Sequence, residues 1–130
     1  DAVLGFPEAE NNLGLTFAEG GVENSAVSPD TRATLDSRYR CTFPEAPGNP
    51  AEVNLRINKS TGAISGTLTL RDPNPEKPDK ELSRKVKFEG LFVPGVNEAG
   101  GFYLLPQLAD PPATSARTAP VLSGVVRVAP

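Results

Sequence analysis

The side chains that most often carry out chemistry in proteins are scarce in this chain. It has no histidine and a single cysteine, Cys41. Without histidine there is no Ser-His-Asp triad, no Cys-His pair and no default general base near neutral pH. Cys41 alternates with Tyr39 and Phe43 on the apolar side of a predicted strand, where a free thiol packs as a small hydrophobic group. We therefore predict a buried structural thiol and no nucleophile.

Carboxylates are the remaining candidates for acid–base or metal chemistry. A pair of them could hydrolyse glycosides, but the candidates fall on outward positions or in loops, and nothing in the sequence brings two together. These candidates are Asp36, Glu52, Glu89 and Glu98. The segment 71–82 offers calcium ligands, but it has three prolines and lacks the glycine and final glutamate of an EF-hand loop. Its ligands would be Asp72, Asn74 and Asp79. We predict no catalytic residue, no metal site, no cofactor and no enzymatic activity.

Several side chains could instead bind a ligand or a partner. Basic residues occupy outward positions of the predicted strands: Arg38, Arg40, Arg56, Arg84, Lys85 and Lys87. On one shared face they would form a basic patch for an acidic polysaccharide or a partner protein. The other interpretation is an ordinary solvated face, because Asp36 and Glu89 are interleaved among them. Tyr103 opposes Phe102 and Leu104, which places it on the outer face or at an end pocket. The predicted ligand contacts are Tyr103, Arg38, Arg40 and Arg56.

Length and charge exclude some classes of partner. The 130 residues suffice for one domain, 1–130, with its own core. The net charge is −3, and residues 1–30 contain six acids and no base. Since phosphate binding requires clustered Lys and Arg, we predict no nucleic-acid partner. No apolar run approaches the roughly 20 residues of a membrane helix, so we also predict no membrane insertion.

A hairpin is the clearest structural element in the sequence. Residues 53–58 alternate between apolar and polar, a turn follows at 59–62, and residues 63–70 alternate again. Gly62 would supply the left-handed residue of the turn. Further strands are predicted at 13–17, 33–43, 84–93, 102–105 and 121–128. The segments 71–82 and 106–120 are predicted to be proline-rich loops.

These elements predict an all-β fold with seven to eight short strands. Both a small antiparallel β-barrel and a barrel-like sandwich use this alternation, so both stay open. Glycines within the strands favour the barrel, since closing a sheet needs bends. They are Gly66, Gly90, Gly101 and Gly124. The predicted core comprises Leu55, Ile57, Ile64, Leu68, Val86, Phe88, Phe102 and Leu104.

The order of the turn and strand segments carries a resemblance. These segments are 57–62 (Ile-Asn-Lys-Ser-Thr-Gly), 64–67 (Ile-Ser-Gly-Thr), 86–93, 100–104 and 122–126. In this order they resemble an uncharacterised β-domain of large secreted or surface proteins of planctomycete and verrucomicrobial bacteria. The resemblance implies export and a place in a larger extracellular assembly, and it has no catalytic residues to transfer. The proline-rich 71–82 and 106–120 segments depart from its shorter pattern.

We therefore expect a non-catalytic structural, adhesive or assembly module of an exported or cell-surface protein. Its partners would be other domains or subunits of a surface assembly. The alternative is a ligand-binding barrel that holds a glycan or a small apolar molecule at one end. The rim of that end would come from 71–82, 94–101 and 106–120, with Tyr103 nearby.

Overall fold

Eight antiparallel strands and one short 3-10 helix form the computed structural model, which describes residues 9–45, 48–93, 97–115 and 118–130. The strands are β1 (Leu13–Glu19), β2 (Thr31–Leu35), β3 (Cys41–Thr42), β4 (Asn54–Ile57), β5 (Ala63–Asn74), β6 (Lys77–Val93), β7 (Glu98–Pro106) and β8 (Val121–Ala129). The helix, η1 (Val22–Asn24), lies between β1 and β2. The predicted all-β class is confirmed.

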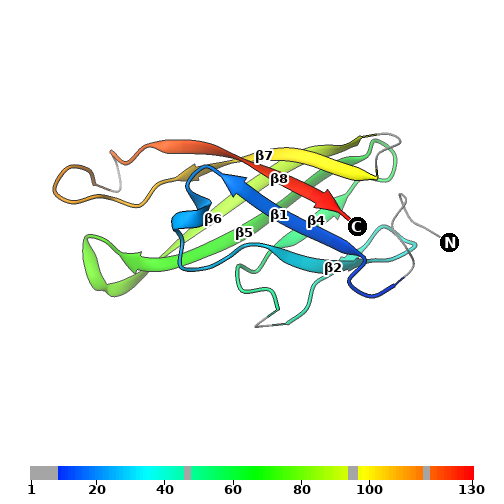
Figure 1. The fold of residues 1–130 in the computed structure, drawn as a ribbon, viewed down its shortest axis with the longest axis horizontal. Helices are drawn as coiled ribbons and strands as arrows, with labels where there is room; N and C mark the ends of the chain where they lie inside the picture. The colour runs from blue at the N-terminus through cyan, green and yellow to red at the C-terminus, as the bar shows by residue number, and fades with distance from the viewer. Residues whose placement is uncertain (1–8, 46–47, 94–96, 116–117) are drawn as a thin grey trace.

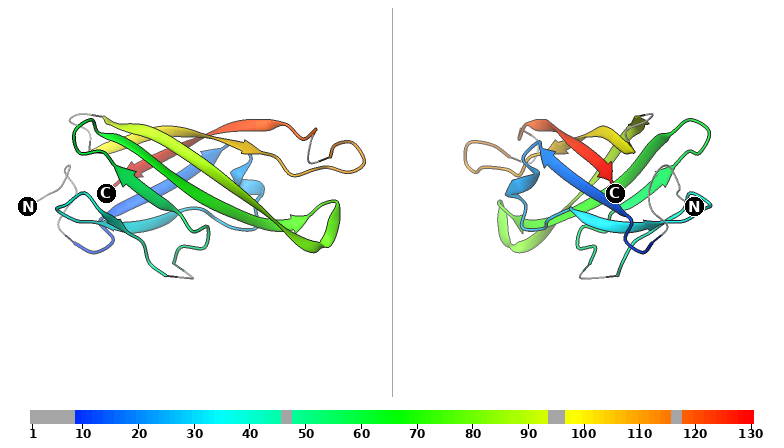
Figure 2. Two further views of the ribbon diagram at one scale, coloured as in Figure 1. Left: turned by 180° about the vertical axis from the view of Figure 1, so that it is seen from behind. Right: turned by 45° about the vertical axis from the view of Figure 1, so that its right-hand side comes forward.

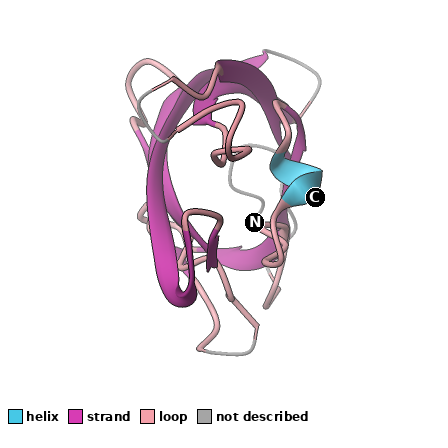
Figure 3. Cartoon of the chain, turned by 90° about the vertical axis from the view of Figure 1, so that its left-hand side faces the viewer, coloured by secondary structure: helices cyan, strands magenta, loops and turns pink. Residues whose placement is uncertain are grey.

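All eight strands belong to one sheet, in the order β3-β2-β1-β8-β7-β6-β5-β4 (Figure 1). The sheet curls until its two edge strands, β3 and β4, come into contact. Views from other directions show the strands wrapping around a common interior (Figures 2 and 3). The fold is thus a nearly closed, barrel-like sheet, which selects the barrel from the two predicted alternatives.

The predicted hairpin at 53–70 is confirmed as β4 and β5. Leu55 pairs with Gly66 and Ile57 with Ile64, and Leu55 and Ile64 point into the core. In the turn between the strands, Asn58 Oδ1 accepts hydrogen bonds from two backbone N–H groups, and Gly62 has a φ of 77°. A side chain that satisfies its own turn favours this hairpin locally.

On the inner side of the sheet, two neighbouring aromatic rings lie between two glycines. Phe88 on β6 pairs with Tyr103 on β7, while Gly66 and Gly124 lie in register beyond them on β5 and β8. A Cβ at Gly66 would lie 2.5 Å from the ring of Phe88, and one at Gly124 would lie 2.2 Å from that of Tyr103. The rings therefore fill the space that these glycines leave. Phe17 packs edge-on against both rings, at centroid distances of 5.3 and 6.0 Å.

The predicted continuous strand 33–43 is wrong, because a tight turn separates β2 from β3. Asp36 Oδ1 accepts hydrogen bonds from the backbone N–H groups of Arg38 (2.8 Å) and Arg40 (3.0 Å). Tyr39 adopts a φ of 63°, which is incompatible with a strand. The short Asp36 side chain accepts these backbone hydrogen bonds locally, so a turn forms here instead of a continuous strand.

The predicted loop at 71–82 is also wrong. β5 and β6 continue through this segment as one long hairpin whose turn lies at 75–76 (Figure 1). Pro73 and Pro78 are tolerated because β4 and β7 pair with the opposite ends of these strands, so neither proline has to donate to a third strand. The register shifts next to Pro73.

Candidate functional site

Tyr103 lies inside the barrel, so its predicted position on the outer face or at an end pocket is wrong. Its side chain is 1% exposed, whereas Phe102 and Leu104, which were predicted to lie in the core, point outward. Both sets of alternating residues in this strand are apolar, so alternation could not identify the inner face. Pairing with Phe88 and Gly124 decides it, because the large ring needs the space above the glycine.

The Tyr103 hydroxyl ties β7 to the end of β1. Its oxygen lies 3.0 Å from the carbonyl oxygen of Ala18 and 2.8 Å from that of Glu19, with the hydroxyl as donor. Burial raises the pKa of Tyr103 to about 12, and the negative charges of Glu23, Asp30 and Glu19 add to the effect. Tyr103 is therefore a structural tie, and the potential near this end of β1 is negative.

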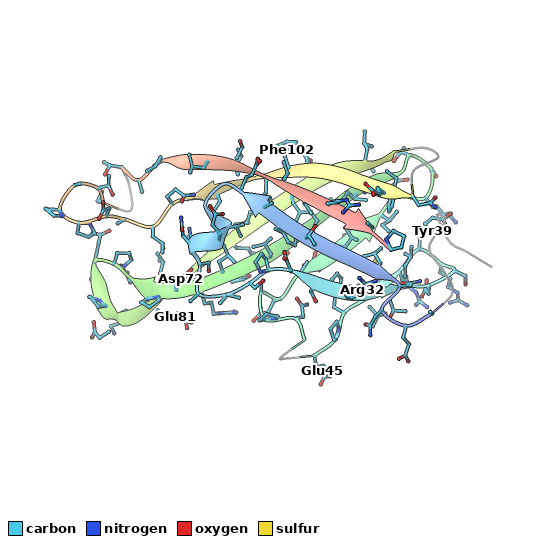
Figure 4. All side chains as sticks on the ribbon, viewed as in Figure 1. Arg32, Tyr39, Glu45, Asp72, Glu81 and Phe102 are labelled. Atoms are coloured by element: carbon cyan, nitrogen blue, oxygen red, sulfur yellow. The ribbon has the colours of Figure 1, made fainter. Side chains whose placement is uncertain are left out.

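Four apolar side chains face solvent on the outer side of β7 and β8. Phe102 is 51% exposed, Leu104 56%, Val121 56% and Val125 46%. Phe102 and Val125 are directly paired, and Figure 4 shows Phe102 on the outer side of its strand. We call these four residues the apolar patch. Contiguous exposed apolar side chains on a soluble fold typically mark an interaction surface. The sequence signal for it was the presence of apolar residues on both faces of β7 and β8.

Basic side chains lie on the β6 side of the apolar patch. A hollow of about 310 Å³ is lined by Lys85 and Lys87 together with patch residues. On the far side of β6, a hollow of about 500 Å³ is lined by the same lysines and by Arg56. Within the described part of the chain, neither lysine has a carboxylate at ion-pair distance, although Glu89 lines both hollows. We call Lys85 and Lys87 the basic flank.

Acidic side chains gather where β1 ends. A hollow of about 460 Å³ there has apolar walls that include Phe17 and Val22. Glu19, Glu23 and Asp30 also line it. Asp30 accepts a hydrogen bond from the Phe17 backbone N–H, whereas no described residue forms an ion pair with Glu19 or Glu23. Because Glu19 pairs with the inward-facing Gly124, its position belongs to the inner side of the sheet and not to the outer side that carries the apolar patch.

The six basic residues do not share one face, as a predicted patch would require. Arg38 and Arg40 lie in the β2–β3 turn, where Arg40 Nε is 3.1 Å from Asp36 Oδ2. Arg84 lies inside the barrel rather than on the outer face. Of the arginines predicted to contact ligand, the structure brings only Arg56 to the lysines of β6.

Arg84 belongs to a buried network that fixes one end of the barrel. Its Nη2 is 3.1 Å from Asp72 Oδ2, and both side chains are at least nine-tenths buried. Asp72 also accepts hydrogen bonds from Ser25 Oγ (2.8 Å) and Ala26 N (2.6 Å), while Arg84 Nη1 donates to the Pro106 carbonyl (2.7 Å). Burial alone would raise the pKa of Asp72, but these hydrogen bonds and Arg84 outweigh it, so the pKa lies below its ordinary value. The network joins the η1 loop, β5 and β6.

The carboxylates considered for catalysis lie in different elements. Asp36 holds the β2–β3 turn. Glu52, which precedes β4 in the sequence, has its Oε1 2.8 Å from Arg71 Nη1. Glu98 on β7 is ion-paired with Arg127. In the described ranges, no group of three or more carboxylate, thiol or imidazole side chains could hold a metal ion. Asp36, Glu52 and Glu98 thus belong to a turn and to separate ion pairs rather than to one shared site.

Cys41, predicted to be a buried structural thiol, is half-buried and packs against the core. Burial, and then the negative charge of Asp36, raise its pKa to about 11. Because the thiolate is the nucleophilic form, a thiol with this pKa is unreactive at neutral pH.

A small pocket lies where the β5–β6 hairpin approaches the end of β7. It has a volume of about 180 Å³ and is lined by residues of 74–84 and 106–109. Both segments belong to the predicted ligand-binding rim; residues 94–96 and 116–117 of that rim lie outside the described residues. The volume is below the roughly 300–1,000 Å³ of typical small-molecule sites.

Comparison with known proteins finds no matching family model, no matching curated protein and no matching solved structure. Across the described residues, no helix has the length and apolar character needed to span a bilayer. The apolar patch, bordered on its β6 side by the basic flank, is the candidate site.

Proposed function

We propose that this domain is a non-catalytic assembly or adhesive module that binds a protein partner through its apolar patch. The observation that carries the proposal is the exposure of Phe102, Leu104, Val121 and Val125 on one face of a barrel whose interior is already filled. These side chains have no place in the core of their own chain. A protein surface is the partner that suits them, because branched aliphatic side chains give a sugar few groups to bind.

The apolar patch supplies part of the free energy of association. Fully burying one such side chain contributes about 1.5–3 kcal/mol, so covering the exposed halves of four contributes on the order of 4 kcal/mol before association entropy. The partner's own contacts must supply the rest, and the basic flank adds orientation rather than much affinity. The patch would thus form the centre of an interface with a polar rim.

We place this module in an exported or cell-surface protein, as the resemblance of its turn and strand segments implies. In that setting its partners are other domains or subunits of a surface assembly. Reliance on a packed core instead of disulfides is compatible with this location, since the chain is long enough to bury a core of its own.

Photo-crosslinking in the producing organism tests the proposal directly. A photoreactive phenylalanine analogue at position 102 or 104 should yield a discrete adduct that maps to defined peptides of one protein. The same analogue at position 42, on the exposed surface of β3, is the matched control and should yield none. Equal labelling from positions 102 and 42, or no adduct at either patch position, would contradict the proposed function.

The alternative of a ligand-binding end is supported by the pocket between 74–84 and 106–109 alone. Its volume of about 180 Å³ accommodates a fragment rather than a sugar ring with substituents. We expect no change in melting temperature of the domain in a glycan and small-molecule thermal-shift screen. A ligand that raises the melting temperature, and loses this effect on substitution of Arg84, would favour the alternative.

A further inference from the structure

We infer that the partner contributes an extended acidic segment, which adds as a further strand along the open edge of β6 beside the apolar patch. This inference rests on the proposed function, because it names the part of the partner protein that this face receives. The segment would form backbone hydrogen bonds with β6 and would place acidic side chains beside the basic flank. The remaining surface of the partner would cover Val121 and Val125.

β6 has one unpaired edge along much of its length. Its pairing with β7 reaches only as far as Phe88, which lies opposite Tyr103. Among the described strands, only β5 pairs with the rest of β6, residues 77–87. β7 itself continues to Pro106 along β8, so the ladder between β6 and β7 ends before either strand does. An unpaired edge presents a row of backbone N–H and C=O groups to a strand from another chain.

The strand register identifies the backbone groups that point to this edge. Phe92 N on β6 donates to the Gly62 carbonyl oxygen (3.0 Å), and the β5–β6 register then continues without a shift as far as Pro73. Because successive residues of an antiparallel strand direct their backbone groups to opposite sides, the even-numbered residues of β6 bond to β5. Ser83 and Lys85 therefore direct their N–H and C=O groups to the unpaired edge.

Pro106 keeps β7 from closing this edge. If the β6–β7 register continued, Pro106 would lie opposite Lys85, but proline has no N–H to donate to the Lys85 carbonyl. The carbonyl of Pro106 accepts a hydrogen bond from Arg84 Nη1 (2.7 Å) instead. The comparable edge of β5 beyond β4 is bridged, since Thr69 N donates to the Ala51 carbonyl oxygen (2.7 Å). The edge of β6 is thus left open to a strand from another chain.

The hollow of about 310 Å³ lies beside this edge and joins it to the apolar patch. Lys85 and Lys87 line the hollow from β6, and Leu104 and Pro106 line it from β7. An extended segment that pairs with β6 would run between the lysines and Leu104. Alternate side chains of a strand point to opposite faces, so one set would lie beside the lysines on the outer face. In strand addition of this kind, backbone hydrogen bonds give affinity and the alternate side chains give specificity.

The charge of the basic flank selects an acidic segment. Among the described residues, neither Lys85 nor Lys87 has a carboxylate at ion-pair distance. Opposite charges on neighbouring strands stabilise their pairing, whereas like charges directly opposite each other destabilise it. Acidic side chains beside the lysines would therefore favour the added strand. The same edge of a second copy would bring lysines against lysines and would be rejected.

Glu89 limits the acidic part of the segment. It follows Lys87 on the outer face of β6, and it pairs with Phe102 where β7 already occupies the edge. The segment would therefore leave β6 before it reaches Glu89. The segment is thus acidic beside the lysines and apolar where it continues over Phe102.

Peptide binding tests the added strand. The ligand is a short fluorescent peptide of alternating valine and glutamate, titrated with the purified chain and followed by fluorescence anisotropy. We expect saturable binding with a dissociation constant tighter than about 1 mM. The same peptide with lysine in place of glutamate should not bind, because it would meet the basic flank. No binding of the glutamate peptide, or equal binding of both peptides, would overturn the inference.

Backbone methylation separates strand addition from attraction between charges. Methylating alternate backbone nitrogens of the glutamate peptide keeps its charge and removes the N–H groups from one of its edges. An added strand bonds to β6 through one edge only. One set of methyl groups should therefore weaken binding by more than about tenfold, and the other set should weaken it less. Unchanged binding of both methylated peptides would show that charge alone holds the peptide, and would overturn the added strand.

Variants of the basic flank test its part in selection. Lys85→Glu with Lys87→Glu should weaken binding of the glutamate peptide by more than about tenfold and should allow the lysine peptide to bind. The gain for the lysine peptide requires a folded chain. Arg38→Glu with Lys59→Glu changes the charge equally at exposed positions outside β6 and is the matched control. Unchanged affinity for the glutamate peptide in the Lys85 and Lys87 variant would overturn selection by charge.

Amide hydrogen exchange followed by NMR locates the bound peptide. With saturating glutamate peptide, the amides of Ser83 and Lys85 should exchange more slowly by about tenfold or more. The amides of Arg84 and Val86, which face β5, should change little. Protection that appears on β3 and not on β6 would contradict the proposed edge.

The added strand and the proposed function can fail separately. If no peptide binds while position 102 still crosslinks to one defined protein, the added strand is wrong and the apolar patch remains a binding surface. If position 102 gives no adduct either, both proposals are overturned.

Discussion

Tyr103 and Asp72 show that the polar groups of the interior are ties between segments that are distant in sequence. The Tyr103 hydroxyl reaches carbonyl groups at the end of β1, and Asp72 binds the η1 loop as well as Arg84. A buried polar group is stabilising only when it is hydrogen-bonded, and both groups meet this condition. Each is therefore expected to matter for stability rather than for chemistry.

Tyr103 makes the stability of the fold sensitive to alkaline pH. Its pKa of about 12 in the folded chain exceeds its ordinary value of 10.0. Between these values the unfolded chain releases a proton that the folded chain retains, so the free energy of unfolding falls as pH rises from about 10 to 12. Urea unfolding across this range should show the decline, and Tyr103→Phe should flatten it. Tyr39→Phe, in the β2–β3 turn, is the control and should leave the slope unchanged.

The ion pair of Asp72 should contribute more to the free energy of unfolding than that of Glu98, and its contribution should be lost at acid pH. Asp72→Asn leaves the buried guanidinium of Arg84 without its counter-charge, which is expected to lower the free energy of unfolding by about 3 kcal/mol or more. Glu98→Gln breaks an ion pair that is largely exposed, so its effect on the free energy of unfolding should be much smaller. Because the folded pKa of Asp72 is lowered, its contribution is present above its ordinary pKa and is lost as pH falls below it. Chemical denaturation of both variants at pH 7 and pH 3 measures these effects, and equal losses at pH 7 would contradict them.

Among the elements, the strands that carry glycine opposite an aromatic ring set the shape of the barrel. β5 and β8 each place a glycine beside a ring on the neighbouring strand, which lets large side chains turn inward without displacing the backbone. Beyond this region the β5–β6 hairpin continues by pairing with itself, and no described strand pairs with its outer edges there. Glycine position and strand pairing, rather than loop length, thus determine where the barrel closes.

Gly124 and Gly100 form a matched pair for testing this role. A Cβ at Gly124 would lie 2.2 Å from the Tyr103 ring, whereas one at Gly100 would meet no atom within 4 Å. Gly124→Ala is expected to destabilise the fold by about 1–3 kcal/mol through overpacking, and Gly100→Ala by no more than about 0.5 kcal/mol. Thermal and urea unfolding compare them. Similar losses in both variants would mean that the Tyr103 ring adjusts freely.

At the scale of the whole molecule, β5 to β8 form the most stable part of the barrel. The least stable part is the seam, where the edge strands β3 and β4 meet. β5 through β8 are joined by long ladders, whereas β3 has two residues and meets β4 without belonging to a common ladder in the described chain. Local opening follows the number of buried contacts and paired strands. The apolar patch lies on β7 and β8, within this more stable part, as a preformed binding surface requires.

Hydrogen exchange read by mass spectrometry tests this distribution. Amides of β7 and β8 should exchange slowest, and those of β3 should exchange at least about tenfold faster, since each 1.4 kcal/mol of opening free energy is a factor of ten. Uniform exchange along the barrel would contradict the weak seam.

Alternation was sufficient to predict the hairpin 53–70, the inward positions of Val86 and Phe88, and the all-β class. In those segments one face is apolar and the other polar, so burial can satisfy only one arrangement. The prediction failed at 33–43 because Asp36 closes a local turn, and at 71–82 because prolines at unpaired strand edges do not break a hairpin.

The strand 102–105 marks the limit of what the amino-acid order can decide. Its alternating positions are apolar on both sides, so either face could have turned inward on local grounds. Pairing with Phe88 and Gly124 turns Tyr103 inward, because only there does its ring find space and its hydroxyl find acceptors. The same pairing leaves Phe102 and Leu104 in solvent beside the basic flank. Local chemistry determines that this chain forms strands, and the contacts between distant strands determine which of its faces is left to bind.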